Sequence, residues 1–307
     1  MRFTLRQLQV FAAIGRIGNV SQAADHLALS QSAASTALAE LERQSGRSLF
    51  DRVGKRLKLN EIGRALLPKA LEMLDRGAEI EALLSGRGGP GGLRFGATLT
   101  IGNYLGPILI EQYWQRHPGA AIRLEVGNTQ RIAARVAAFD LDLGLIEGEI
   151  ADPDLILSDW IEDELAVFCG PDHPLTASGT ASIDRLLDER WVVREPGSGT
   201  RQALDRAMSP YGSRWHFGLE LEHTEAIKRM VETGRCVSCI SRIALQDAFK
   251  IGRLVEIRVP ELALKRRYYF VLHRQKYRTP AIEAFMAVCR DIALPEPRLP
   301  AGLAQAR

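Results

Sequence analysis

The sequence predicts a winged helix-turn-helix at the N-terminus, then a long linker helix, then a two-lobed α/β domain. Three observations support this fold class. Apolar residues recur at helical spacing over the first 85 residues, with two short strand-like stretches among them. Residues 85–92 are rich in glycine, which is typical of a linker. Beyond them, strand-like and helix-like stretches alternate, which favours α/β lobes with mainly parallel sheets.

The composition is that of an ordinary globular protein. A chain of 307 residues is long enough for about two domains. Hydrophobic residues make up 46% and charged residues 25%, which argues against a mostly disordered chain. No apolar run reaches the length of a membrane span, about 18 residues. The N-terminus is unlike a signal peptide, and four cysteines do not make a disulfide scaffold. We therefore expect a soluble, cytoplasmic protein with no membrane partner.

Three short helices with tight connections predict the helix-turn-helix within residues 1–60. Thr4 and Gln7 have the spacing of a capping box, so the first helix is expected to begin at this point. We expect Ser21 to cap the second helix and Ser30 to cap the third. These residues establish the start of each helix from local chemistry alone.

A wing and a long helix are expected next. Residues 46–59 have the pattern of two short strands around the basic turn Gly54-Lys55. Asn60 can cap a helix that we expect over residues 61–86. This helix is amphipathic over about 25 residues and needs a partner helix to bury its apolar face. Pairing of two chains is our interpretation, and packing on its own domain is the alternative.

Positive charge is concentrated at the N-terminal end. The net charge of the whole chain is only +3. From Met1 to Lys58, nine basic residues face four acidic ones, a net charge of +5. A local basic excess is the electrostatic footprint of a module that binds nucleic acid.

More than a dozen residues in the first 65 follow one known pattern, and the sequence resembles the LysR-type transcriptional regulators there. Two departures are visible: Asn19-Val20 stands where Ser-Phe is usual, and Asn60 stands where Thr is usual. Asn60 and Thr are both good helix caps, so the fold is not threatened. The matching residues are Leu8, Phe11, Ala23-Ala24, Leu27, Ser30-Gln31-Ser32-Ala33, Ser35, Leu38, Leu41-Glu42, Gly46, Leu49-Phe50, Arg52 and Gly63.

The resemblance implies a regulator that binds partly palindromic, double-stranded promoter DNA. Its third helix would enter the major groove, where short polar side chains reach base edges, and its wing would contact phosphates or the minor groove. For Ser30, helix capping is favoured over base contact. Many family members carry Arg where Thr36 stands, which weakens the expectation for Thr36. The expected DNA-binding residues are Ser30, Gln31, Ser32, Ser35, Thr36, Arg52, Lys55 and Arg56.

The resemblance continues to about Leu294 and implies an effector-binding domain similar to type 2 periplasmic solute-binding proteins. After a hinge at 87–92, lobe one is expected at 93–161 and 268–294, and lobe two at 162–267. Residues 295–307 are expected to form a flexible tail. The family further implies a homodimer or homotetramer, and contact with RNA polymerase if the protein is an activator.

Within the family, several stretches are similar to the branch tied to sulfur metabolism and sulfite response; they are residues 100–105, 127–129, 142–148, 194–201 and 224–228. Two loops, 97–102 and 196–200, follow strands and open helices, so they offer free N–H groups and hydroxyls to a small oxyanion such as sulfite or sulfate. Helix capping alone is the alternative for these hydroxyls. The expected effector-binding residues are Thr98, Thr100, Asn128, Glu147, Ser198, Gly199, Thr200 and Thr224.

Glu147 complicates the oxyanion interpretation, because a carboxylate repels an anion. It can pair with Arg201 or Lys228, select a protonated ligand such as hydrogen sulfite, or bind an amino group. An amino-bearing or aromatic acid is therefore an alternative effector, and a repressor that needs no effector is a further one. His223 stands near this region, where it either reaches the cleft and adds pH sensitivity, or faces solvent or caps a helix.

We expect neither an enzyme nor a cofactor or metal site. Cys236 and Cys239 have CxxC spacing, but they lie in an apolar, strand-like run, so packing is the favoured interpretation. No nucleophile elbow, P-loop or dinucleotide glycine pattern is present in the sequence. A hydrolase built on the effector domain would need a nucleophile and base that we do not find.

Overall fold

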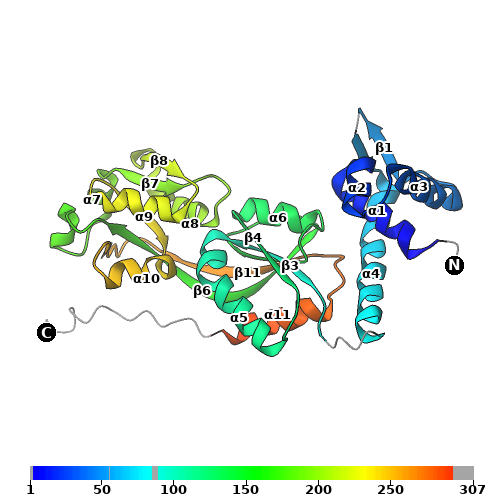
Figure 1. The fold of residues 1–307 in the computed structure, drawn as a ribbon. Coiled ribbons are helices and arrows are strands. Elements are labelled where there is room, and N and C mark those ends of the chain that lie inside the picture. The colour runs from blue at the N-terminus through cyan, green and yellow to red at the C-terminus, as the bar shows by residue number, and fades with distance from the viewer. Residues whose placement is uncertain (1–2, 55, 85–88, 293–307) are drawn as a thin grey trace.

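The computed structural model describes residues 3–54, 56–84 and 89–292. The winged helix-turn-helix domain lies at one end, a long helix stands beside it, and two α/β lobes follow in a row (Figure 1). Lys55, the first part of the glycine-rich segment and the predicted tail 295–307 lie outside the described residues. No helix in the described ranges is long and apolar enough to cross a bilayer.

The N-terminal domain forms where the local signals predict it. Thr4 and Gln7 form a complete capping box at the start of α1, and Ser30 caps α3. Our prediction for the second helix was wrong, because Asn19, not Ser21, accepts the hydrogen bond from Gln22 N as the cap of α2. The elements are α1 (Leu5–Ile17), α2 (Val20–His26), α3 (Gln31–Ser45), β1 (Phe50–Val53) and β2 (Arg56–Leu59).

The long helix α4 (Glu61–Leu84) has two different halves. Asn60 Oδ1 accepts from Gly63 N at 2.9 Å and caps the helix. Leu67 and Leu71 of the first half are buried in the core of the N-terminal domain, against α1. Near the other end, Leu83 and Leu84 are 78% and 84% exposed. Packing on its own domain therefore accounts for the first half of the helix only.

Lobe one has a parallel core of three strands. β3 lies between β4 and β5 and pairs with both in parallel. A short π-helical turn, Ile101–Leu105, leads from β3 into the first covering helix. Helices lie on both faces of this sheet (Figure 1). The elements are β3 (Leu93–Thr98), β4 (Ile122–Gly127), β5 (Leu143–Glu147), α5 (Gly106–Arg116), α6 (Thr129–Ala137) and α11 (Pro280–Asp291).

Lobe two repeats this plan with its own apolar core, in which Trp191 is fully buried. β7 pairs in parallel with β8 and β9. Cys236 and Cys239 are buried and free, which confirms the packing interpretation of the CxxC spacing. The elements are α7 (Ile183–Leu187), β7 (Trp191–Arg194), α8 (Gly199–Met208), β8 (Phe217–Leu221), α9 (Thr224–Glu232), β9 (Val237–Ser241), α10 (Arg242–Lys250) and β10 (Val255–Ile257).

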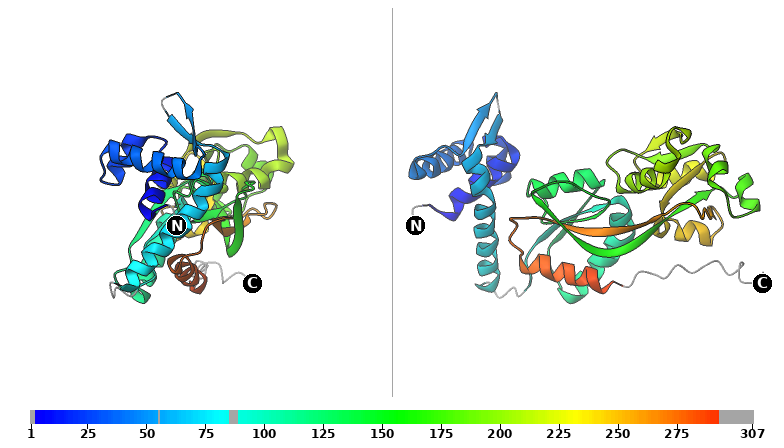
Figure 2. Two further views of the ribbon diagram at one scale, coloured as in Figure 1. Left: turned by 90° about the vertical axis from the view of Figure 1, so that its right-hand side faces the viewer. Right: turned by 180° about the vertical axis from the view of Figure 1, so that it is seen from behind.

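Two long strands join the lobes. β6 (Leu155–Cys169) and β11 (Lys265–His273) run antiparallel to each other through both lobes (Figure 2). β11 pairs with β5 in lobe one, and the far end of β6 pairs with β9 and β10 in lobe two. These pairings are all antiparallel, so the prediction of mainly parallel sheets holds for the strands within each lobe and fails at the crossovers. Where the chain crosses, Asp163 and Arg266 stand opposite each other in register.

Candidate DNA interface and effector site

The predicted recognition helix presents short polar side chains to solvent. Gln31, Ser32, Ser35 and Thr36 of α3 are all exposed. Ser30 Oγ accepts from Ala33 N at 3.2 Å, so its cap role is present. Ser30 Oγ also lies 3.0 Å from Ser32 Oγ, which ties these two hydroxyls to each other.

The wing carries exposed cations. Arg52 stands on β1 and Arg56 on β2, and both are exposed. Neither forms an ion pair with a residue that the structure describes. Lys55, at the tip of the turn, lies outside the described residues. An unpaired surface arginine is free to exchange counterions for a phosphate, which suits contact with the DNA backbone.

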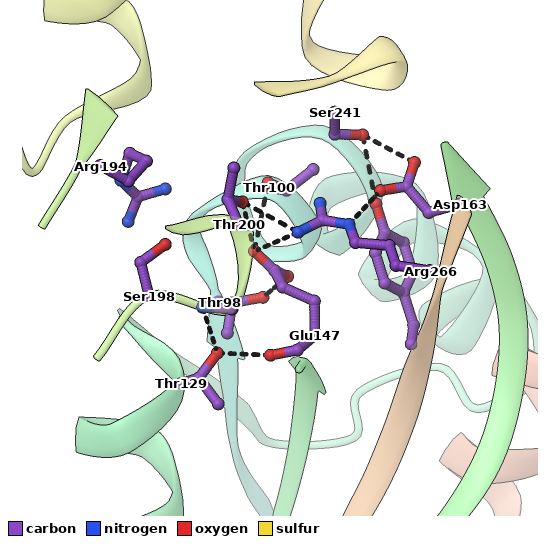
Figure 3. Close-up of polar contacts among 12 residues, drawn as sticks. Thr98, Thr100, Thr129, Glu147, Asp163, Arg194, Ser198, Thr200, Ser241 and Arg266 are labelled. Carbon is purple, nitrogen blue, oxygen red and sulfur yellow. Dashed lines mark hydrogen bonds and ion pairs between the residues drawn. The ribbon is translucent and has the colours of Figure 1, made fainter. Parts of the chain in front are cut away.

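The second site lies between the lobes and is centred on Glu147, the last residue of β5. This side chain is only 1% exposed. Its carboxylate accepts hydrogen bonds from the hydroxyls of Thr98, Thr100 and Thr200, the last two at 3.4 Å (Figure 3). Thr98 and Thr100 come from lobe one, whereas Thr200 comes from lobe two. The two predicted loops thus converge, but they converge on a carboxylate of the protein itself.

Arg266 of β11 completes this cluster and was missed by the sequence analysis. Its side chain is 5% exposed, and Nη1 lies 3.7 Å from Glu147 Oε1. The same nitrogen donates to Thr200 Oγ1 at 2.9 Å, while Nε donates to Asp163 Oδ2 at 2.6 Å. Its remaining nitrogen, Nη2, is buried without a hydrogen-bond partner among the described residues. The only local signal was strand alternation, since Arg266 lies between the exposed residues Lys265 and Arg267.

We call Thr98, Thr100, Glu147, Thr200 and Arg266 the effector cluster. Together with the neighbouring Asp163, this cluster has an uneven charge balance. Two buried carboxylates, Glu147 and Asp163, face a single guanidinium. Burial opposes the charge of Arg266, but Glu147 and then Asp163 hold its pKa above the ordinary value, so it stays charged. Ser241 Oγ donates to Asp163 at 2.7 Å and helps to satisfy that carboxylate. With both acids ionised, the site carries one excess negative charge.

Other predicted effector residues lie around the cluster in different roles. Ser198 caps α8, and Asn128 caps α6 while its Nδ2 donates across the cleft to Glu195 at 3.2 Å. Gly199 is in close contact with lobe one, because a Cβ on it would lie 2.0 Å from the Glu147 carbonyl oxygen. Thr224 is buried, and its hydroxyl has no partner among the described residues.

The pairing that we considered for Glu147 was wrong. Arg201 pairs with Asp205 and Glu220, at 2.8 and 2.6 Å. Lys228 pairs with Glu225 at 2.7 Å. Both cations are thereby held within lobe two, and Arg266 is the cation that lies beside Glu147 instead.

His223 is exposed and makes no side-chain cap at the start of α9, which agrees with the solvent-facing alternative.

A pocket of about 240 Å³ leads to the cluster from the surface. Gly199 and Arg266 line it, together with the cations Arg206, Lys265 and Arg267 and the carboxylates of Glu149 and Glu162. Arg206 pairs with Glu149 at 2.9 Å, and Arg267 pairs with Glu162 at 3.0 Å. In the described part of the chain, no group of His, Cys, Asp and Glu is arranged to hold a metal ion.

Comparison with known families settles the class of the protein. Residues 5–64 match the family described as "Bacterial regulatory helix-turn-helix protein, lysR family", and residues 86–293 match "LysR substrate binding domain". This chain belongs to the LysR family of transcriptional regulators. As a LysR regulator it is a DNA-binding protein with an effector-binding domain, and not an enzyme. The LysR family also has oligomeric members that bind promoter DNA and small molecules.

One sequence relative and one solved structure match nearly the whole chain, and a second solved structure matches about two thirds of it. The chain is 42% identical over 295 residues to an uncharacterised HTH-type transcriptional regulator, YeiE, of Escherichia coli, covering 96% of this chain and all of YeiE. A full-length OxyR variant from Pseudomonas aeruginosa has a TM-score of 0.72 at 22% identity, with 94% of this chain and 95% of that chain covered. The Synechocystis CcmR regulatory domain in complex with 2-PG has a TM-score of 0.60 at 28% identity, covering 65% and 96%.

Proposed function

We propose that this LysR regulator responds to a small oxyanion of the sulfite type, bound at the effector cluster between the lobes. The observation that carries the proposal is the buried Nη2 of Arg266, which lacks an acceptor among the described residues. Leaving a buried charged donor unsatisfied is costly, so an anionic oxygen at this point would stabilise the site. The hydroxyls of Thr98, Thr100 and Thr200 now donate to Glu147, and they would have to turn from that carboxylate to donate to the anion.

The charge balance selects the protonation state of that oxyanion. Because Glu147 and Asp163 already outweigh Arg266, a fully ionised anion would be repelled. An anion that brings one proton can instead donate a hydrogen bond to the Glu147 carboxylate. Besides the two acids, the titratable side chains around this carboxylate are Tyr268 and Arg266. Hydrogen sulfite exchanges its proton near neutral pH, whereas hydrogen sulfate keeps its proton only in strong acid. The cluster therefore favours sulfite over sulfate.

We further propose how the signal reaches DNA. Residues of both lobes contact Glu147, so a ligand at this point has different contacts in open and closed arrangements of the lobes. The exposed end of α4, with Ile80, Leu83 and Leu84, would pair two chains, and effector domains would pair further chains into a tetramer. A change between lobes would then alter the spacing or bending of the bound promoter. RNA polymerase would be a further partner if the protein is an activator.

One alternative to sulfite keeps the same site. An amino-bearing acid would place its ammonium group on Glu147 and its carboxylate on Arg266, and the excess negative charge supports this second candidate. The neighbouring structure of CcmR with 2-PG supports a small-molecule ligand of some kind in such a domain.

Calorimetric titration of the full chain with sulfite, sulfate and O-acetylserine tests the proposal. We expect sulfite to bind, sulfate to bind far more weakly, and Arg266→Lys and Thr100→Val each to weaken sulfite binding by about tenfold or more. Arg266→Lys keeps the buried positive charge, so it removes the forked donor and not the ion pair. Lys250→Met is the control, because Lys250 is exposed on α10 and does not line the pocket that leads to the cluster. Full sulfite affinity in both cluster variants would refute the site, and heat from O-acetylserine alone would select the amino-bearing alternative.

A further inference from the structure

A second pocket lies where the winged helix-turn-helix domain meets lobe one, and we call it the junction pocket. Its volume is about 460 Å³, and its walls come from both domains. Arg6 and Arg16 come from α1, whereas Arg94, Arg123 and Arg135 come from lobe one. Five guanidinium groups therefore line one cavity, together with the imidazole of His26, the last residue of α2.

Two of these arginines are direct neighbours in the sheet. Arg94 of β3 and Arg123 of β4 stand opposite each other in the parallel register. Like charges at facing positions of neighbouring strands are unfavourable unless a counter-charge lies between or beside them. Arg94 has such a partner, Asp142, at 2.9 Å. Arg123 forms no ion pair with any residue in the described ranges.

The carboxylates around the junction pocket are already engaged. Arg135 pairs with Glu125 at 3.0 Å and with Asp140 at 2.9 Å. Asp142 is shared between Arg94 and Lys276, the latter at 3.1 Å. Five arginines thus face three carboxylates, and two of these three also serve a cation outside the five, since Asp142 pairs with Lys276 and Glu125 pairs with Arg131 at 3.5 Å. At least two positive charges remain uncompensated.

The remaining cations lie on α1. Among the described residues, Arg6 donates hydrogen bonds only to neutral groups, the side chain of Gln9 and the carbonyl of Leu27. Arg16 Nη2 donates to the carbonyl oxygen of Phe139 in lobe one, which is a neutral acceptor. Its Nε lies 3.8 Å from Asp140, which Arg135 already holds, and this nitrogen is buried without a hydrogen-bond acceptor among the described residues. Burial, and after it the nearby Arg94, lower the pKa of Arg16, which is the expected response of a cation that lacks a full counter-charge.

We propose that the junction pocket binds a small organic acid with two anionic groups, of the phosphate-ester or dicarboxylate class. Its anionic groups would bridge the arginines of α1 and those of lobe one, where paired guanidinium donors suit carboxylate and phosphate oxygens. Ile17, Leu74 and Leu141 give the pocket an apolar wall for the carbon skeleton of the ligand. This site is separate from the effector cluster and does not depend on the proposed sulfite ligand.

The ligand would act on the position of the DNA-binding domain. Phe139 of lobe one is buried in the apolar core of that domain, and Lys276 pairs with Asp75 of α4 at 2.8 Å. These contacts bring the two walls of the pocket together. An acid that needs both walls binds only when α1 lies on lobe one, so it shifts the population toward this arrangement. The result is a second input to the same regulator.

Calorimetry of the full chain with glycerol 3-phosphate, succinate and inorganic phosphate tests this proposal. We expect binding of at least one of the two organic acids, and a loss of about tenfold or more in the double variant Arg6→Gln, Arg123→Gln. Neither arginine has a carboxylate partner among the described residues, so the variant should fold. Arg116→Gln, in lobe one but outside the pocket, is the control and should leave binding unchanged. The acid with the higher affinity identifies the ligand class, a phosphate ester if it is glycerol 3-phosphate and a dicarboxylate if it is succinate.

Several outcomes would overturn the proposal. These are no binding of any probe, binding of inorganic phosphate alone, or equal affinity in the double variant and the wild type. A double variant that loses only affinity for promoter DNA would mean that these arginines serve the DNA backbone instead. Sulfite binding is measured in the same variants: it should persist in the double variant, and junction binding should persist in Arg266→Lys. Failure of one site is thereby distinguished from failure of the other.

Discussion

Gly199→Ala adds one methyl group at the closest approach of the two lobes. Gly199 is the first residue of α8 in lobe two, and the carbonyl of Glu147 lies directly against it. Alanine is the better helix former, so the substitution should stabilise α8 taken by itself. Any loss of stability or affinity must therefore come from the contact between lobes.

The size of the effect follows from the geometry. The new Cβ would lie 2.0 Å from the carbonyl oxygen, whereas ordinary contact begins at 3.4 Å, so the lobes must separate by about the difference, 1.4 Å. The same movement would lengthen the hydrogen bond from Gly199 N to Thr129 Oγ1, now 3.2 Å, and that from Thr200 to Glu147, now 3.4 Å, beyond bonding range. Two lost hydrogen bonds correspond to about 2 kcal/mol.

Thermal unfolding and sulfite titration of the full chain measure these losses. We expect Tm to fall by about 4–8 °C and the affinity for sulfite to fall by about tenfold or more. Gly92→Ala is the matched control, because the nearest atom to its new Cβ is 3.9 Å away. If Gly199→Ala unfolds and binds like Gly92→Ala, the closed contact between the lobes is refuted, whichever ligand the cluster takes.

Three further predictions concern other parts of the chain. In the wild type, we expect the affinity for sulfite to fall by about tenfold per pH unit above neutral, and Glu147→Gln should abolish this pH dependence. Calorimetry at several pH values checks this, and equal slopes of affinity against pH in both proteins would contradict it. Lys276→Met should lower the free energy of unfolding by about 2 kcal/mol, because Asp75 and Asp142 lose a buried cation. Burial opposes the charge of Asp142, but Lys276 and Arg94 hold its pKa below the ordinary value. The stability that Lys276 contributes is therefore present near neutral pH and is lost as the pH falls. Urea unfolding should show a smaller difference in the free energy of unfolding between variant and wild type at pH 4 than at pH 7. Arg52→Ala should weaken binding to all DNA sequences and reduce the salt slope by about 1, and an unchanged slope in a binding titration would count against a phosphate contact.

Local chemistry accounts for what could be predicted well. Thr4, Ser30 and Asn60 start helices because each offers an oxygen to an N–H group a few residues further along the same chain. The one wrong cap, Ser21 in place of Asn19, shows the limit of the method, since two good capping residues stood two positions apart. Thr98, Thr100 and Thr200 could be grouped from the sequence, because each lies where a strand-like stretch ends and a helix-like stretch begins.

The sequence by itself determined the winged helix-turn-helix, the alternation of strands and helices in the lobes, and the loops that carry the hydroxyls of the effector cluster. Only the tertiary structure decided what those hydroxyls face. Arg266 meets Asp163 from 103 residues away, and Lys276 meets Asp75 from 201 residues away. The physical reason is that caps and periodicity depend on near neighbours in the chain, whereas the pairing of a buried charge depends on which strands the whole fold brings together.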